Sequence, residues 1–298
     1  MGRKRMSDSV FLENNKLFLA YLFAFLAVLS WATAPLLFKI GIKSLSFDLA
    51  VFWFLLFGGV VLTAINLRRI IDINRKFLFF ALVVGVATSV HYLGYLNGIM
   101  SQQVSLSIAI AKTSPIFQAI FAGLLLGAGI KKRTALSMIT CFVGVIFVTT
   151  NLQFQAFKFT SAIISTLAAA IAWGFLLIVM IKSEQDEILL TGVSLTFAAI
   201  FTLIFSILQG KNIALPAENS EWFWLFYLGV APTAVGVALW AKALKMADKM
   251  VHSIIILDYL TPVIGVAACI IFLKEKISFW FIMGFALVVI GNLLRDKK

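Results

Sequence analysis

The chain contains ten runs of mostly apolar residues, each close to the length of a membrane-spanning helix, with short polar linkers between them. The runs lie at residues 17–38, 46–67, 77–98, 103–127, 134–150, 159–181, 189–209, 222–244, 252–273 and 277–294. A helix of roughly 20 apolar residues crosses the ~30 Å hydrocarbon core of a bilayer. In lipid, every backbone polar group needs an internal partner, which a helix supplies. The pattern predicts an all-α membrane protein with ten transmembrane helices.

Composition and charge support this prediction. Of 298 residues, 62% are hydrophobic and 13% are charged, whereas about 25% of residues are charged in soluble domains. The net charge of +12 is divided among short clusters, such as 3–5 and 131–133. Such clusters are typical of cytoplasmic loops and unlike a nucleic-acid-binding face. We therefore expect a lipid bilayer, and no nucleic acid, as the partner of this chain.

The distribution of lysine and arginine predicts an orientation. With ten spans both termini lie on one side, and that side carries 18 of these residues against 6 on the other. Lysine and arginine accumulate on the cytoplasmic side of membrane proteins. We expect a multi-pass protein of the inner cell membrane with both termini in the cytoplasm.

The two halves of the chain resemble each other. Matching segments recur at offsets of 142, 144 and 147, in the same order along each half: 29–31 with 171–173, 85–87 with 229–231, and 114–117 with 261–264. The sequence thus predicts two five-helix repeats, residues 1–152 and 153–298. Because five is an odd number of spans, the second repeat is expected to be inverted, an arrangement typical of secondary transporters with a site near the midplane.

Two motifs carry a resemblance to a known family. Residues 29–35, Leu-Ser-Trp-Ala-Thr-Ala-Pro, resemble the tryptophan motif of the EamA-type transporters of the drug/metabolite transporter superfamily. Residues 257–263 and 273–277 resemble the junction of helices 9 and 10 in that family. The resemblance implies ten helices, cytoplasmic termini and a central cavity lined by helices 1, 3, 4, 6, 8 and 9. Members of this family move amino acids and other small metabolites, often outward.

Two charged residues lie within predicted spans, each just before a proline that matches across the repeats. Lys112 precedes Pro115, and Asp258 precedes Pro262. Charges at membrane depth are costly and mark functional positions. At 1.5 Å per residue, straight helices would separate their depths by roughly 10 Å, so a direct ion pair requires the lysine side chain to reach across. Either a zwitterionic solute bridges the two groups, or they form a structural pair between the repeats.

Aromatic residues form a second set of candidates. His91 and Tyr95 lie one helical turn apart and predict a polar cavity wall with a proton-relaying histidine, or else a packing histidine. Three tryptophans predict either an aromatic lining for an apolar or cationic group or ordinary helix packing. The predicted substrate-binding residues are Trp31, His91, Tyr95, Lys112, Trp173, Trp240, Asp258 and Tyr259.

Prolines within the spans are candidate hinges, because proline removes a backbone donor from a helix. They are Pro35, Pro115, Pro232 and Pro262.

Together these features favour a secondary transporter that moves a small organic metabolite by alternating access. We expect an amino acid or a related carboxylate-bearing solute, exported from the cell, with no cofactor or metal, by a monomer or a homodimer. The alternatives are a channel-like or facilitative carrier for nucleotide-related or vitamin solutes, and an intramembrane enzyme. The enzyme is the least favoured, since the chain has only His91 and His252 and no zinc-protease motif.

Overall fold

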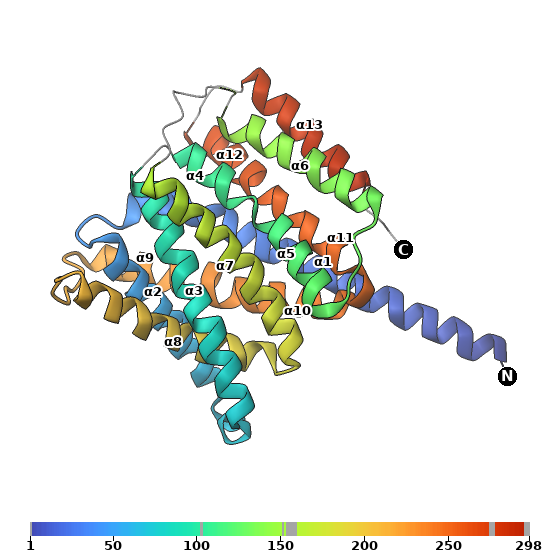
Figure 1. Ribbon diagram of the computed structural model, residues 1–298, viewed down its shortest axis with the longest axis horizontal. Helices are drawn as coiled ribbons and strands as arrows, with labels where there is room; N and C mark the ends of the chain where they lie inside the picture. Colours follow the sequence, from blue (N-terminus) through green and yellow to red (C-terminus); the bar gives the residue numbers. More distant parts are fainter. Residues whose placement is uncertain (1, 102–103, 151, 153–159, 274–277, 295–298) are drawn as a thin grey trace.

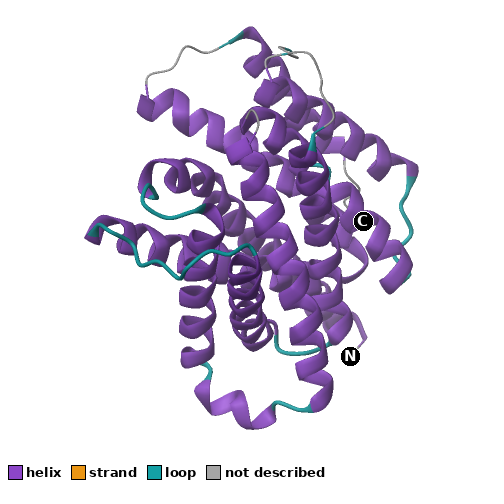
Figure 2. Ribbon diagram, turned by 60° about the vertical axis from the view of Figure 1, so that its left-hand side comes forward, coloured by secondary structure: helices purple, strands orange, loops and turns teal. Residues whose placement is uncertain are grey.

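The computed structural model describes residues 2–101, 104–150, 152, 160–273 and 278–294. Within them the chain is helical without strands (Figures 1 and 2). Residues 274–277, most of one family-like motif, lie outside the described part. The α-helices are α1 Gly2–Gly41, α2 Phe47–Ile65, α3 Arg75–Ser101, α4 Val104–Ala111, α5 Ser114–Leu126, α6 Lys132–Thr150, α7 Ser161–Ser183, α8 Glu187–Leu208, α9 Asn219–Leu228, α10 Gly236–Ala247, α11 Val251–Ile255, α12 Leu260–Leu273 and α13 Phe279–Leu294. Between them lie the 3₁₀-helices η1 Leu67–Asp72, η3 Asp248–Met250 and η4 Ile256–Tyr259, and the π-helix η2 Gly229–Val235.

Nine stretches of the described chain are long and apolar enough to cross a membrane. Their outer surfaces carry exposed apolar side chains, such as Phe79 and Leu124, which suit contact with lipid. The tenth expected run, 277–294, contains α13, whose 16 residues extend about 24 Å at 1.5 Å per residue. The chain is thus a multi-pass membrane protein, and the described residues do not confirm a count of ten.

Three of the expected spans are interrupted, each at or beside a predicted hinge. The fourth consists of α4 and α5, separated by a turn that contains Lys112, and Pro115 lies in the first turn of α5. In the eighth, Pro232 lies inside the π-helix between α9 and α10. In the ninth, η4 separates α11 from α12, and Pro262 follows it. Pro35, in contrast, lies within the continuous helix α1.

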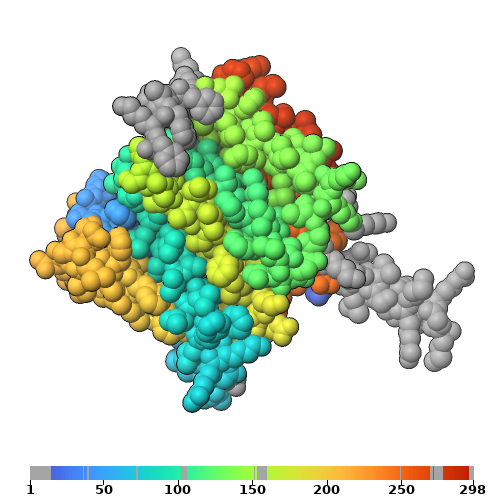
Figure 3. Space-filling model, viewed as in Figure 1, coloured from blue at the N-terminus to red at the C-terminus, as the bar shows by residue number. Residues whose placement is uncertain are grey.

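Helices of the two halves pack against each other in equivalent pairs. α3 contacts α7 just as α1 contacts α10, while α2 pairs with α8 and α6 pairs with α13 (Figure 1). Exchanging the halves converts the first pair into the second and leaves the other two unchanged. In the space-filling view, α3, α7 and α5 form one continuous face that combines both halves (Figure 3).

Close backbone contacts repeat this reciprocity at single residues. A Cβ atom on Gly85 would lie 3.3 Å from the backbone of Ala198, and one on Gly229 would lie 2.2 Å from the carbonyl of Phe54. Gly229 follows Gly85 by 144 residues, and Ala198 follows Phe54 by 144 residues. The second contact is therefore the repeat counterpart of the first. Such distances leave no room for a side chain at Gly229. The repeat seen in the sequence is therefore also a repeat of contacts.

The two ends of the bundle carry different polar contacts. At one end, which we call the Arg69 end, Arg69 pairs with Asp186. At the opposite end, the Glu221 end, the Glu221 carboxylate accepts hydrogen bonds from the backbone amides of Lys43 at 2.6 Å and Ser44 at 2.7 Å. Glu221 thereby attaches the loop after α1 to the start of α9. The Arg69 end and the Glu221 end are thus the two opposite ends of the helix bundle.

Candidate functional site

A cavity of about 290 Å³ lies between the two halves of the protein. Its wall comes from α1, α3, α4, α7, η2, η4 and α12, with additions from α2, α5 and α9. The lining residues of α1 begin at Trp31 and those of α3 begin at His91, in the parts of these helices nearer the Glu221 end. Small-molecule sites commonly enclose roughly 300–1,000 Å³. The cavity is therefore large enough for a small metabolite. It lies nearer the Glu221 end than the Arg69 end of the bundle.

An ion pair forms part of the cavity wall. Lys112 Nζ lies 2.7 Å from Asp258 Oδ1, and the two side chains are 14% and 1% exposed. Thr261 Oγ1 donates a second hydrogen bond to the same carboxylate oxygen at 3.0 Å. The other oxygen, Asp258 Oδ2, is buried and has no hydrogen-bond partner among the described residues. One carboxylate oxygen of Asp258 is thus bound twice, whereas the other is buried and unpaired among the described residues.

Breaks in two helices bring these charges together. Lys112 lies in the turn after α4, where its amide donates to Ile108 O at 2.9 Å, and Asp258 lies in the 3₁₀-helix η4. Pro115 and Pro262 have no backbone N–H to continue an α-helix through these points. The separation expected for straight helices does not hold here, and the direct pair forms. Discontinuous helices commonly build sites of this kind in transporters.

His91, Tyr95 and Trp173 form an aromatic part of the wall. The ring centroid of His91 lies 4.5 Å from that of Trp173 and 5.9 Å from that of Tyr95, which is stacked at 8°. His91 Nδ1 lies 3.0 Å from the carbonyl of Ala169. A carbonyl only accepts, so His91 Nδ1 carries the hydrogen in this bond. This hydrogen bond fixes the orientation of the His91 ring, and the ring lies on the cavity wall. The proton-relay role of His91 stays a prediction.

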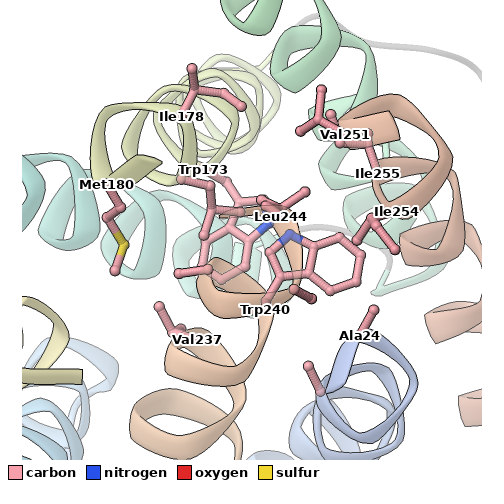
Figure 4. Close-up of a cluster of buried hydrophobic side chains, with 14 of the residues drawn as sticks. Ala24, Trp173, Ile178, Met180, Val237, Trp240, Leu244, Val251, Ile254 and Ile255 are labelled. Carbon is pink, nitrogen blue, oxygen red and sulfur yellow. The ribbon is translucent and has the colours of Figure 1, made fainter. Parts of the chain in front are cut away.

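The three predicted tryptophans meet at one end of the cavity. Trp31 lies 5.2 Å from Trp173 and 5.1 Å from Trp240, measured between ring centroids. Trp31 Nε1 also donates to the carbonyl of Pro232 at 2.8 Å, which links α1 to the π-helix. Trp31 and Trp173 line the cavity, but Trp240 is fully buried behind them. Figure 4 shows Trp173 and Trp240 among buried aliphatic side chains that include Leu244.

The structure thus places six of the eight predicted binding residues on the cavity wall and two behind it. Besides Trp240, Tyr259 is fully buried, and its hydroxyl has no partner among the described residues. Neither residue lines the cavity in this structure: Trp240 packs behind Trp31, and Tyr259 lies at the end of η4 with its side chain in the protein interior. Of the four hinge prolines, Pro115 alone is absent from the wall.

Some wall residues were not predicted from the sequence. Thr261, which donates a hydrogen bond to Asp258, belongs to the segment that matches across the repeats. Its place in that segment could have identified it as a candidate wall residue. Thr233, which accepts a hydrogen bond from the Tyr92 hydroxyl at 3.2 Å, follows the predicted hinge Pro232. Phe54 gives no signal, since it is one of 29 phenylalanines in the chain. No metal-binding group of three or more side chains occurs in the described chain.

The comparisons with known proteins agree with this architecture. The chain is 23% identical over 284 residues to an uncharacterized transporter from Archaeoglobus fulgidus, covering 93% of this chain and 97% of that protein. An uncharacterized transporter from Clostridium kluyveri is 24% identical over 190 residues, which is 61% of this chain and 60% of that protein. A solved structure described only as a crystal structure of a protein aligns with a TM-score of 0.79 at 18% identity, over 93% of this chain and 97% of that chain.

The family comparison assigns both repeats. The model of the EamA-like transporter family matches twice, over residues 18–150 and 160–294, and so covers nearly the whole chain. The two matches coincide with the two halves whose contacts are reciprocal, and the resemblance in the tryptophan motif points to the same group. The relatives and the family both make this protein a membrane transporter. The chain belongs to the EamA-like transporter family.

Proposed function

We propose that this protein is a secondary transporter that moves an amino acid, or a related zwitterionic or carboxylate-bearing solute, by alternating access. The proposal includes ten spans arranged as two inverted repeats, with the Arg69 end and both termini in the cytoplasm and net export of the solute. The observation that carries it is the Lys112–Asp258 ion pair on the wall of the cavity.

The ion pair matches a zwitterion in charge. Each charge at membrane depth costs about 2.5–3.5 kcal/mol even on an insertion scale, and the pair offsets this because the two charges neutralise each other. An amino acid brings the same two charges in one molecule. Its carboxylate would bind Lys112 and its ammonium would bind Asp258, so that both protein charges stay paired. A singly charged solute would leave one of them without a partner.

The remainder of the wall supports a solute with an apolar or flat side chain. Among the described lining residues, Lys112 and Asp258 are the only ones with full charges at neutral pH, apart from the titratable ring of His91. The other side chains are mainly aromatic or aliphatic, such as Tyr95 and Ile99. The same aromatic wall is the observation that favours the second candidate, a carrier for nucleotide-related or vitamin solutes with planar rings.

Ligand-induced stabilisation of the purified protein tests the substrate class. A ligand at 100 times its Kd raises the free energy of unfolding by about 2.7 kcal/mol. We expect free amino acids to raise the melting temperature, and their methyl esters and N-acetyl derivatives, which each lack one charge, to have little effect. Equal stabilisation by all three forms would contradict recognition by the ion pair. Stabilisation only by planar nucleobase or vitamin solutes would favour the second candidate.

Counterflow in proteoliposomes tests the mechanism. Vesicles preloaded with the stabilising solute should accelerate uptake of its labelled form, because a carrier exchanges substrate and a channel does not. Lys112→Met should abolish this exchange. Lys211→Met is the matched control, since Lys211 also forms a 2.7 Å pair, with the buried Asp48, but lies outside the cavity. Loss of counterflow in both variants would point to general damage and count against the proposal.

A further inference from the structure

A second, very small void lies on the opposite side of Trp173 from the cavity. Its volume is about 10 Å³, and residues from α3, α7, α8 and α10 surround it. Val84 and Thr88 line it from the part of α3 nearer the Arg69 end, whereas the cavity meets α3 from His91 onward. Trp173 belongs to both walls. The two spaces are therefore separated by a thin layer of which Trp173 is a part.

The small void is lined largely by the repeat counterparts of cavity residues. Six of its nine lining residues occupy positions equivalent to residues that line the cavity. The pairs, cavity residue first, are Trp31 with Trp173, Ala34 with Leu176, Phe38 with Met180, Leu228 with Val84, Pro232 with Thr88, and Tyr92 with Val237. The void is thus the closed equivalent of the cavity in the other half of the repeat.

The π-helix fixes the alignment of these pairs. The offset is 144 as far as Pro232 within η2, as for Gly85 and Gly229, and it is 145 at Gly236, because a π-turn accommodates one extra residue. The contacts confirm the change. His91 lies against Trp173, and Gly236, 145 residues after His91, lies against Trp31, the counterpart of Trp173. Equivalent residues on both sides therefore make equivalent contacts around the tryptophan layer.

Several buried side-chain polar groups have no hydrogen-bond partner among the described residues, and three of these, outside the cavity wall, have repeat counterparts that line it. They are both amide atoms of Gln118, the Tyr259 hydroxyl and Trp240 Nε1, and all three side chains are fully buried. At the offsets of 145 and 147 their counterparts all line the cavity: Gly265 for Gln118, Lys112 for Tyr259, and Tyr95 for Trp240. Leaving such a group unpaired in a protein interior costs roughly 1–3 kcal/mol. This arrangement is explained if another conformation uses these groups.

We propose that Gln118, Tyr259 and Trp240 line a second cavity, which opens toward the Arg69 end when the present cavity closes. In that conformation the three polar groups meet water or the zwitterionic solute during its release. Because the repeats are equivalent, the small void expands as the cavity collapses, and Trp31 and Trp173 remain between them. This inference rests on the proposed alternating-access function and adds the residues of the opposite-facing site.

Cysteine accessibility tests the proposal without any substrate. In a background with Cys141 and Cys269 replaced by alanine, Gln118→Cys would be labelled with a membrane-impermeant thiol reagent in vesicles of either orientation. A conformation populated at 0.1–10% exposes a residue far more often than unfolding does. We expect labelling from the Arg69 end at least roughly tenfold faster than for Ala199→Cys. Ala199 is the matched control, since it is fully buried and its counterpart Leu55 does not line the cavity.

Two further variants complete the test. Ile108→Cys, on the present cavity wall, should be labelled from the Glu221 end, and labelling it first should slow the reaction of Gln118→Cys in the double variant. Tyr259→Phe removes only the unpartnered hydroxyl. We expect it to reduce counterflow while ligand-induced stabilisation persists, whereas a purely structural hydroxyl would leave counterflow unchanged.

The outcomes separate this inference from the proposed function. Labelling of Gln118→Cys no faster than that of Ala199→Cys, or labelling from the Glu221 end, would overturn the second cavity, as would unchanged counterflow in Tyr259→Phe. None of these results depends on which solute stabilises the protein. Absence of stabilisation by amino acids would refute the substrate class and leave the labelling result intact.

Discussion

Replacing Lys112 by methionine removes one partner of the ion pair and keeps most of the side-chain volume. Asp258, which is 1% exposed, would then retain only the hydrogen bond from Thr261. Breaking a buried ion pair by removing one partner costs about 3–5 kcal/mol. Asp258→Asn should cost less, roughly 1–3 kcal/mol, because Lys112 is 14% exposed and water in the cavity can hydrate its ammonium group.

The double variant separates a stabilising pair from a binding pair. With both charges removed, no uncompensated charge remains, and the loss should be smaller than the sum of the single losses by about 1–3 kcal/mol. Thermal unfolding in detergent, combined with counterflow in proteoliposomes, measures both properties. We expect the double variant to recover stability and to remain inactive in transport, because the solute has lost both of its charged partners.

A second ion pair supplies the control for this cycle. Lys211 and Asp48 have the same 2.7 Å separation, and Asp48 is fully buried. Lys211→Met, Asp48→Asn and their combination should show a similar coupling in stability with transport unchanged in the double variant. The reasoning is refuted if the Lys112→Met/Asp258→Asn double variant transports normally. In that case the pair only joins the halves.

Three further predictions concern the frame around the site. Glu221→Ala removes the acceptor of two backbone amides in the loop 42–46 and should lower the free energy of unfolding by roughly 1–3 kcal/mol, which denaturant titration measures; an unchanged midpoint would contradict this role. Gly144→Val would place a Cβ atom 2.7 Å from the carbonyl of Gly284 and should lower the free energy of unfolding by about 1–3 kcal/mol through the α6–α13 contact. The melting temperature should therefore be lower than that of the control variant Leu136→Val, whose side chain is exposed. Reporter fusions at either terminus should read cytoplasmic and a fusion within 211–219 external, and an external C-terminus would overturn the orientation.

The helical membrane architecture was predictable because lipid leaves few choices to an apolar run. Long apolar segments fix where helices form, and the matched segments around Pro115 and Pro262 located the repeats. The breaks at Lys112 and Asp258 were less predictable, since proline in a membrane helix can kink it, end a segment or leave it continuous, as Pro35 does in α1. The direct ion pair follows from those breaks and not from straight-helix geometry.

Sequence predicted most of the polar and aromatic residues on the cavity wall, but not the extent of the cavity. Charged residues, histidine and tryptophan within the apolar runs are few enough to stand out, and Lys112, Asp258, His91 and Trp173 do lie on one cavity. Trp240 was expected there as well. Sequence places a residue on a helix, but whether the cavity reaches that residue depends on how the helices pack, and in the proposed second conformation Trp240 would line the opposite cavity.

The ion pair connects the two proposed roles of the site. Lys112 belongs to the first repeat and Asp258 to the second, so their bond joins the halves across the interface at which they would move in the proposed transport cycle. A ligand shifts a conformational equilibrium only through a difference in its affinity for the two states. A zwitterion that replaces the direct bond with two bonds of its own removes this link between the repeats without leaving a bare charge, and only when it is present. Under this proposal the ion pair would both stabilise the structure and bind the substrate, and occupancy itself would free the halves to rearrange.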